Sequence, residues 1–271
     1  MKDDRIRKAV RKAYAKVAQR GSSCCEPAEA SECGVDSLQT SSQAMGYSDK
    51  DLKSVPKGAD LGLGCGNPVA IATLRAGETV VDLGSGGGFD CFLAAKRVGK
   101  QGRVIGVDMT PEMIEKAREN AHKGKYGNVE FRLGEIEHLP VADQSVDVVI
   151  SNCVINLAPD KKAVLKDAFR VLKRGGRLAI SDLALIKELP VKLRKSIDAY
   201  TGCIGGAIML DEYKRAVRAA GFKHIKFTVK DRQAETTVQE QNECSGSAGK
   251  KPELARLLAK SVVAVYIQAV K

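Results

Sequence analysis

The 271-residue sequence lacks several features that mark common functional classes. It contains no run of eighteen apolar residues, which argues against a transmembrane helix. The N-terminal stretch MKDDRIRKAVRKAY is charged and has no apolar core segment, so we expect no signal peptide and a cytoplasmic protein. No C-x-x-C pair and no paired histidine spacing occurs, so the eight cysteines do not predict a zinc site.

Aromatic residues are also scarce, at 4%, which provides poorly for the stacking of nucleic-acid bases. The formal net charge of +11 would suit a polyanion, but basic residues alternate with acidic ones along the expected helices. We interpret the charge as a solvated surface, with an anionic substrate or nucleic acid as the second interpretation. We therefore expect no nucleic-acid partner, no membrane partner and a monomeric chain.

Eight cysteines remain to be explained. A disulfide scaffold does not fit a chain of this length in a reducing compartment. The cysteines are then either core residues, since Cys is among the most often buried types, or reactive thiols.

Short apolar strands alternate with helices from Glu78 onward. The strands are predicted at TVVDL (79–83), RVIGVD (103–108), VEFRLG (129–134), VDVVIS (146–151), RLAISDL (177–183), HIKFTVKD (224–231) and VVAVYIQAVK (262–271). Helices are predicted at FDCFLAAKRV (89–98), after Thr110-Pro111, and at KKAVLKDAFRVLK (161–173), where Gly175-Gly176 should end the helix. This alternation predicts an α/β fold: a parallel sheet with helices on both faces.

The N-terminal region carries a different pattern. Residues 5–19 predict an amphipathic helix, and SDKDLKSVP (48–56) predicts a short helix capped by Ser48. A stretch rich in Ser, Gly and Gln near residues 233–250 predicts an exposed insertion between the last two strands.

Two glycine-rich loops lie close together, LGLGCGNP (61–68) and DLGSGGG (82–88). The second follows a strand and opens a helix, where glycine lets a ligand lie against the backbone. Asp108 ends the next strand about 20 residues later, where a carboxylate can bind both hydroxyls of a ribose. Because residue 89 is Phe, the dinucleotide pattern G-x-G-x-x-G is not met.

The D-L-G-x-G-x-G loop and LKRGGRLAISD (172–182) resemble class I S-adenosylmethionine methyltransferases. This resemblance implies a Rossmann-like, mostly parallel seven-stranded sheet with the last strand antiparallel. It also implies roles for individual residues: the methionine end of the cofactor on Asp82, Gly84, Ser85 and Gly86, the ribose on Asp108, and the adenine beside Met109, Glu135 and Ile136. The alternative is a Rossmann-like domain for another nucleotide.

The chemistry of such a sheet lies beyond the carboxyl ends of its strands. There the fourth strand leads into SNCVINL, with Cys153, and the later loop YTGCIGGA carries Cys203. Cys65 lies in the first glycine-rich loop. Three thiols beside a methyl donor suggest a soft trivalent ligand such as arsenic, which binds three sulfurs in a pyramid. The Asn/Asp-Pro-Pro-aromatic motif of nucleic-acid methyltransferases is absent. Asn152 either lies near the sulfonium or ends the strand.

Five motifs in order, LGLGCGNP, DLGSGGGFDCF, VIGVDMTPEM, SNCVINL and GCIGGA, closely resemble arsenite S-adenosylmethionine methyltransferases over roughly residues 8–230. This resemblance implies methylation of arsenite or its thiol conjugates, with Cys153 and Cys203 as the arsenic-binding pair and Cys65 as the third thiol. It further implies a disulfide between Cys65 and an N-terminal cysteine, reduced by thioredoxin or glutathione. Cys33 matches best by its distance from Cys65, while Cys24 and Cys25 also qualify. The loop glycines would let Cys65 swing between arsenic and that thiol.

The resemblance also divides the chain. Residues 1–75 form an N-terminal helical, cysteine-bearing segment expected to cover the active site, and residues 76–271 form the S-adenosylmethionine-binding methyltransferase domain. After FTVKD the chain is shorter than many family members. Cys91, within the second motif, is expected in the core. Cys244 is expected to have no role, and His122, His138 and His224 are expected at the surface.

Two other functions compete with this prediction. One is a methyltransferase for a small organic acceptor, such as a quinone precursor, which would tolerate Cys→Ser at all three thiols. The other is a metalloid-binding thiol protein without catalysis, which the Asp82–Asp108 signature disfavours.

Overall fold

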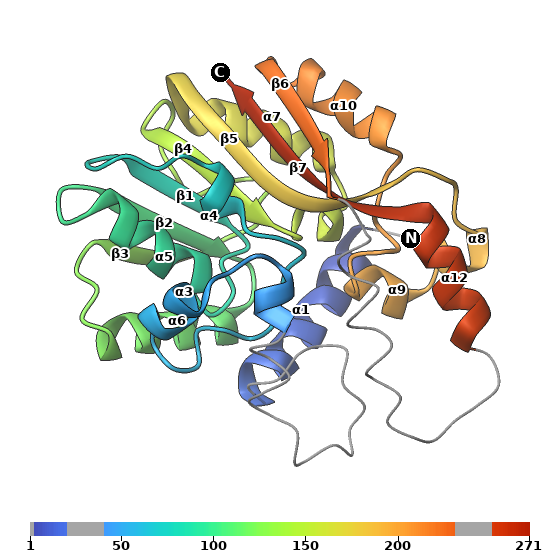
Figure 1. Ribbon diagram of the computed structural model, residues 1–271, viewed down its shortest axis with the longest axis horizontal. Coiled ribbons are helices and arrows are strands. Elements are labelled where there is room, and N and C mark those ends of the chain that lie inside the picture. The colour runs from blue at the N-terminus through green and yellow to red at the C-terminus, as the bar shows by residue number, and fades with distance from the viewer. Residues whose placement is uncertain (1–2, 21–40, 231–250) are drawn as a thin grey trace.

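The structure, a computed structural model, describes residues 3–20, 41–230 and 251–271, which form a twisted sheet flanked by helices (Figure 1). The strands are β1 (Thr79–Leu83), β2 (Arg103–Asp108), β3 (Val129–Leu133), β4 (Val146–Asn152), β5 (Leu172–Leu185), β6 (Lys223–Val229) and β7 (Val262–Val270). Their spatial order is β3-β2-β1-β4-β5-β7-β6. β7 runs antiparallel to both of its neighbours, whereas the pairs from β3 to β5 are parallel. The predicted seven-stranded, mostly parallel sheet with an antiparallel last strand is therefore confirmed.

The helices that cover the sheet are α4 (Pro68–Ile71), α5 (Phe89–Val98), α6 (Pro111–Lys123), α7 (Lys161–Val171) and α10 (Leu210–Ala219). α4, α5 and α6 lie on one face, and α7 and α10 lie on the other (Figure 1). Alternate strand residues serve the two faces, because side chains along a strand point in opposite directions. Val80 of β1 belongs to the buried cluster that includes Phe92 of α5, whereas the next residue, Val81, packs in the cluster of Leu165 of α7.

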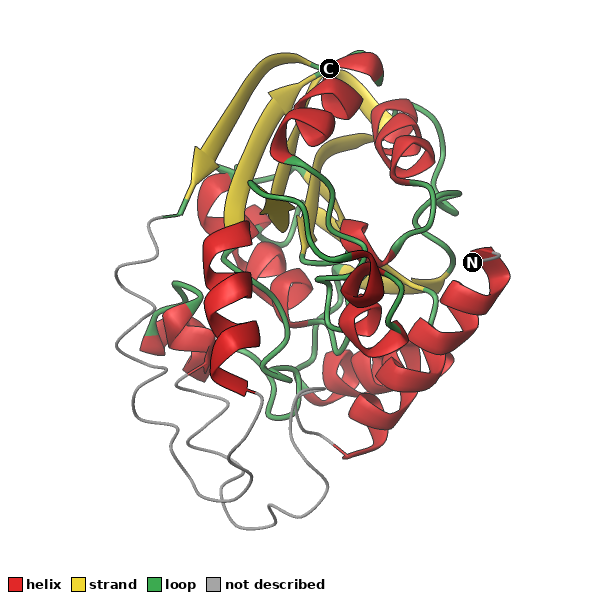
Figure 2. Cartoon of the chain, turned by 90° about the vertical axis from the view of Figure 1, so that its right-hand side faces the viewer, coloured by secondary structure: helices red, strands yellow, loops and turns green. Residues whose placement is uncertain are grey.

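The remaining helices are α1 (Asp3–Arg20), α3 (Asp49–Ser54), the 3-10 turn η1 (Ile155–Leu157), α8 (Val191–Arg194), α9 (Ile197–Thr201) and α12 (Lys251–Ser261). Apart from α3, they gather near the carboxyl ends of the parallel strands, where loops also crowd together (Figure 2). α3 lies against the C-terminal ends of α5 and α6, where it contacts Arg97 and Tyr126. α1 packs against α6 and α9. The predicted helices at 5–19 and 48–56 are confirmed as α1 and α3, and Ser48 forms the full capping box with Asp51.

The predicted end of the helix that starts at residue 161 is wrong. α7 ends at Val171, and Leu172 already has extended backbone and pairs with Val146 of β4. The next β4 pairing is Val148 with Arg177, so residues 173–176 bulge out of the strand. The two glycines therefore shape a bulge within β5, with Gly175 at φ +75°, rather than a helix cap.

The sequence also missed α12, which directly precedes β7. The predicted insertion near 233–250 lies outside the described residues. Among the helices that are described, none is long and apolar enough to span a bilayer.

Gly206 controls the path of the loop that carries Cys203. A Cβ at this position would lie 2.0 Å from the carbonyl oxygen of Asn156, a backbone atom that cannot rotate away. We expect Gly206→Ala to lower the free energy of unfolding by about 1–3 kcal/mol, as for other overpacked sites. Gly127→Ala is the control, because no atom lies within 4 Å of its Cβ, and we expect a change within about 0.5 kcal/mol. Urea denaturation of both variants measures the difference, and equal midpoints would contradict the close packing.

Candidate functional site

A cavity of about 650 Å³ opens at the carboxyl ends of the parallel strands. The structure brings together at its wall most of the residues predicted for the cofactor and the arsenic: Cys65, Asp82, Gly84, Ser85, Gly86, Asp108, Met109, Ile136, Asn152, Cys153 and Cys203. Arg7, Val10 and Tyr14 of α1 also line it. Residues that are more than 190 positions apart in the chain therefore share one chamber.

The second glycine-rich loop forms one end of this cavity. Gly84 has φ +67°, and a Cβ there would lie 2.2 Å from the Val154 side chain, so only glycine fits. The N–H of Gly86 donates a hydrogen bond to the Asp108 carboxylate (3.0 Å), and the N–H of Thr110 donates to its other oxygen (2.8 Å). These bonds fix Asp108 at the cavity wall, and each carboxylate oxygen keeps a further lone pair for a ligand hydroxyl.

Acidic side chains dominate the polar lining of the cavity. The carboxylates at the wall are those of Asp60, Asp82, Asp90, Asp108 and Glu137. Burial, followed by the negative charges of Asp90 and Asp108, raises the pKa of Asp82 well above its usual range. This acidic chamber lies within a chain of net charge +11, so its charge is opposite to that of the molecule as a whole.

Of the two residues predicted to border the adenine, only one lies at the cavity. Ile136 lines it, but Glu135 does not, and the carboxylate that does is that of Glu137. Glu135 instead forms an ion pair with Arg7 of α1 (3.2 Å), and Glu137 accepts a hydrogen bond from the same guanidinium (3.0 Å). The pair of acidic residues therefore holds α1 against the loop that follows β3.

Cys153 and Cys203 both have left-handed backbone, at φ +57° and φ +63°. This conformation is uncommon for residues other than glycine and costs of the order of 1–3 kcal/mol, and it is concentrated at functional sites. The Cys153 N–H is held by the carbonyl of Ser181 (2.7 Å). The Cys203 thiol donates to the carbonyl of Cys153 (2.9 Å) and lies 3.9 Å from the Tyr14 hydroxyl.

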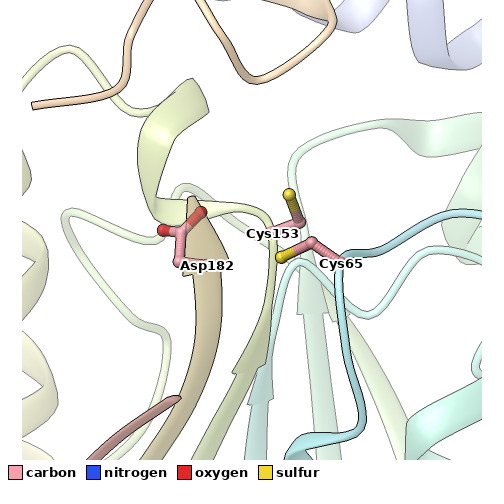
Figure 3. A group of neighbouring side chains, drawn as sticks. All are labelled: Cys65, Cys153 and Asp182. Carbon is pink, nitrogen blue, oxygen red and sulfur yellow. The ribbon is translucent and has the colours of Figure 1, made fainter. Parts of the chain in front are cut away.

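Cys65 meets Cys153 from the first glycine-rich loop (Figure 3). Their sulfur atoms and a carboxylate oxygen of Asp182 all lie within 4.8 Å of one another. Burial raises the pKa of the Cys65 thiol. Hydrogen bonds with Cys203 and Cys65, followed by burial, raise the pKa of Cys153 well above its usual range. The two thiols are therefore held protonated in the free protein.

Close packing explains the glycines around Cys65. A Cβ on Gly64 would lie 2.7 Å from the Asn152 amide, and a Cβ on Gly66 would lie 2.2 Å from the Ser181 hydroxyl. The loop thus rests directly on the ends of β4 and β5. The proposed swing of Cys65 stays a prediction.

The Asn152 amide holds this loop in place. Its oxygen accepts from the Cys65 N–H (3.0 Å), and its nitrogen donates to the Gly66 carbonyl (2.8 Å) and lies 3.0 Å from the Tyr47 hydroxyl and 3.2 Å from Asp90. Tyr47 in turn donates to Asp90 (2.6 Å), whose pKa burial raises to about 6. Asn152 therefore lines the cavity and also positions Cys65, which the sequence alone did not indicate.

The other cysteines and the histidines can be placed in part. Cys91 is fully buried, as predicted, and its thiol donates to Asp82 (3.2 Å). His122, His138 and His224 are exposed, as predicted. The predicted resolving residue Cys33, its alternatives and Cys244 lie outside the described residues. Arg7, Tyr47 and Asp182 were missed at the level of sequence, because their partners are distant in the chain.

Comparison with known proteins assigns the family. The sequence profile described as a methyltransferase domain matches residues 74–240. The chain superposes on the structure of an arsenic(III) S-adenosylmethionine methyltransferase from Chlamydomonas reinhardtii with a TM-score of 0.63 and 31% identity, covering 86% of this chain and 73% of that one. The chain belongs to the arsenite methyltransferase family.

Two curated relatives support the assignment. An arsenite methyltransferase from Halobacterium salinarum is 51% identical over 238 residues, which are 86% of this chain and 61% of that protein. The arsenite methyltransferase of Homo sapiens is 43% identical over 152 residues, 53% of this chain and 40% of that protein. The chain thus spans less than two thirds of the length of these family members.

We expect Asn152→Ala to expose Cys65 to solvent reagents. The variant leaves the Cys65 N–H and the Gly66 carbonyl without their partner, which costs about 1–3 kcal/mol and favours an open loop by roughly ten-fold. Alkylation of the native protein by iodoacetamide, read at the Cys65 peptide by mass spectrometry, should accelerate by about that factor. Asn128→Ala is the matched control, because its amide also binds backbone carbonyls but at Ala95 and Gly99. Equal protection of Cys65 in both variants would contradict the positioning role of Asn152.

Proposed function

We propose that this chain transfers methyl groups from S-adenosylmethionine to trivalent arsenic. One observation supports the proposal most strongly: Cys65, Cys153 and Cys203 line one cavity together with the glycine-rich loop and Asp108. A methyltransferase of another substrate needs the glycine-rich loop and Asp108 for its cofactor, but it does not need the three cysteines. The family relatives, which are arsenite methyltransferases by name, point to the same substrate.

The cofactor end of the cavity fits S-adenosylmethionine. Asp108 is oriented by two backbone N–H groups and can bind the ribose hydroxyls, with Met109 and Ile136 beside the adenine. Asp82 and the backbone of residues 84–86 would hold the methionine end. The cofactor supplies an electrophilic methyl group on a cationic sulfonium, and the acidic lining attracts that cation. Because the charge is lost on transfer, the same carboxylates would bind the product less tightly.

The thiol end of the cavity would hold the substrate. Cys65, Cys153 and Cys203 would exchange with the hydroxyl groups or thiol ligands of trivalent arsenic, and each thiol proton would leave with the displaced ligand. Three thiolates leave the arsenic lone pair free. Asn152 positions Cys65 and also lines the cavity, so it can fix the distance between the two ends. Such positioning can supply a large part of the rate enhancement, since a misplacement of about 1 Å costs about 100-fold.

Methyl transfer formally oxidises arsenic by two electrons. We propose that Cys65 and an N-terminal cysteine, Cys33 or its neighbours Cys24 and Cys25, return those electrons by forming a disulfide. An external thiol, thioredoxin or glutathione, would then reduce the disulfide. We also propose that residues 1–75 act as the cover of the site, because Arg7, Val10 and Tyr14 line the cavity.

Methyl transfer from labelled S-adenosylmethionine to arsenite, with thioredoxin or glutathione present, tests this proposal. We expect methylated arsenic from the wild type and a loss of at least about 100-fold in Cys153→Ser and Cys203→Ser, with cofactor binding intact. Cys244→Ser, for which the sequence predicts no role, is the matched control and should retain activity.

Two outcomes would contradict the proposal. If the wild type binds S-adenosylmethionine but yields no methylated arsenic, the acceptor is an organic molecule and the thiols serve packing. If arsenite binds to the thiols but no methyl group is ever transferred, the chain is a metalloid-binding protein.

A further inference from the structure

A buried carboxylate lies beside the thiols, and methyl transfer gives it no task. Asp182, near the carboxyl end of β5, is fully buried, and one of its oxygens lies within 4.8 Å of both Cys65 Sγ and Cys153 Sγ (Figure 3). Cys203 is not a member of this close group, and its thiol donates to the Cys153 carbonyl. Two thiols and a carboxylate are therefore already gathered in the free protein.

The hydrogen bonds of Asp182 orient the carboxylate without neutralising it. One oxygen accepts from the Asn156 amide (2.9 Å) and the Leu183 N–H (2.8 Å), and the other accepts from the Tyr213 hydroxyl (3.1 Å). Within the described part of the chain, no Lys or Arg forms an ion pair with it. The positive charge of Lys161 lowers the pKa of Asp182, but its amino group donates hydrogen bonds to the carbonyls of Asn156 and Ala158 instead. Buried carboxylates are usually paired with a cation or bound to a metal ion, so this one is suited to a positive ligand.

We propose that Cys65, Cys153 and Asp182 form a site for a thiophilic divalent cation of the Zn²⁺ type. Three atoms within 4.8 Å of one another share a centre that is at most about 2.8 Å from each. Zinc lies about 2.3 Å from sulfur and about 2.0–2.2 Å from a carboxylate oxygen, so shifts of well under 1 Å complete the site. Solvent from the cavity would fill the fourth, tetrahedral position.

Binding needs no oxidant or reductant. The two thiols release their protons to solvent and bind the cation as thiolates. Burial raises the pKa of Asp182 to about 7, so the protonated fraction of this group also releases its proton, and the second oxygen of the carboxylate keeps a protein hydrogen bond. Trivalent arsenic, under the proposed function on which this step rests, uses the same two thiols with Cys203 as its third ligand. The two ligand sets share Cys65 and Cys153, so the cation and arsenic exclude each other. Zinc is thus a competitive inhibitor with respect to arsenite.

The direct test is X-ray absorption at the zinc edge on the reduced full-length protein loaded with one Zn²⁺. We expect two sulfur neighbours with oxygen or nitrogen completing the shell. Zinc titration against a chromophoric chelator gives the affinity, and Cys153→Ser measures the background from the other cysteines. A shell of three or four sulfurs, or no zinc binding above the Cys153→Ser background, would overturn the proposal.

Two variants separate the carboxylate from the third thiol. D182N keeps the shape of the side chain and reverses one hydrogen bond: its amide oxygen can accept from Asn156 and Leu183, and its amide nitrogen can donate to the Tyr213 oxygen, which donates in the wild type. We expect it to weaken zinc by at least about ten-fold, since loss of even an outer partner of a metal ligand costs 10–100-fold. Its binding of arsenite, measured as thiols titrated per arsenic, should be unchanged. Cys203→Ser should show the reverse: its hydroxyl can still donate to the Cys153 carbonyl, so zinc binding should persist, whereas arsenite loses its third thiol.

These outcomes also distinguish the two proposals. If D182N binds zinc as tightly as the wild type, or if Cys203→Ser no longer binds zinc, the proposed cation site is wrong, whatever the result for arsenite binding. If D182N fails to fold, judged by the loss of S-adenosylmethionine binding, the zinc affinity of Cys203→Ser and the number of sulfur neighbours seen by X-ray absorption still test the cation site. If zinc depends on Asp182 but excess arsenite never displaces it from the wild type, the cation site stands and the three-thiol arsenic site of the proposed function fails.

Discussion

The two contacts that the Asn152 amide makes with the Cys65 loop are the constraint on which the site depends. Its oxygen holds the N–H of Cys65 and its nitrogen holds the carbonyl of Gly66, so both sides of the thiol-bearing residue are fixed by one planar group. An aspartate of the same shape has no donor for the carbonyl, and a leucine has neither function. Gly64 follows from this contact, because a Cβ there would overlap the amide. From the end of β4 the same side chain also reaches Asp90 of α5, so it joins the loop to that helix.

The cavity and the molecule as a whole carry charges of opposite sign, so they favour ligands of opposite charge. The sequence has 44 basic and 33 acidic residues, yet the wall of the cavity carries five carboxylates and Arg7. Burial and repulsion from neighbouring carboxylates raise the pKa values of Asp82 and Asp90, so the chamber disfavours negative charge on these two groups. A cationic ligand relieves that repulsion, whereas an anionic one increases it. The basic exterior therefore says little about the ligand, and the cavity argues against a polyanion inside it.

The local sequence pattern was enough to predict most of the strands and helices and the loops that carry the site residues. The strands TVVDL and RVIGVD begin and end at the predicted residues, because each is a short apolar run bounded by turns. The end of α7 was mispredicted, because Leu172 gains a strand partner in Val146 that the local sequence does not contain. The placement of Glu137 at the cavity wall, which the sequence did not indicate, has the same kind of cause. Which of two nearby acidic residues faces the cavity depends on where the turn after β3 points, and on Arg7 more than 120 residues earlier.

Cys91 shows what a cysteine looks like when packing explains it. It lies within α5, is fully buried, and has an ordinary helical backbone. Cys153 and Cys203 are nearly as buried, at 8% and 7% exposed, but both have left-handed backbone, where glycine would be relaxed. Each position thus costs stability that a glycine would recover. Strain of this kind is retained where the side chain itself is needed. The backbone conformation, which no sequence pattern encodes, therefore argues that these two thiols bind something.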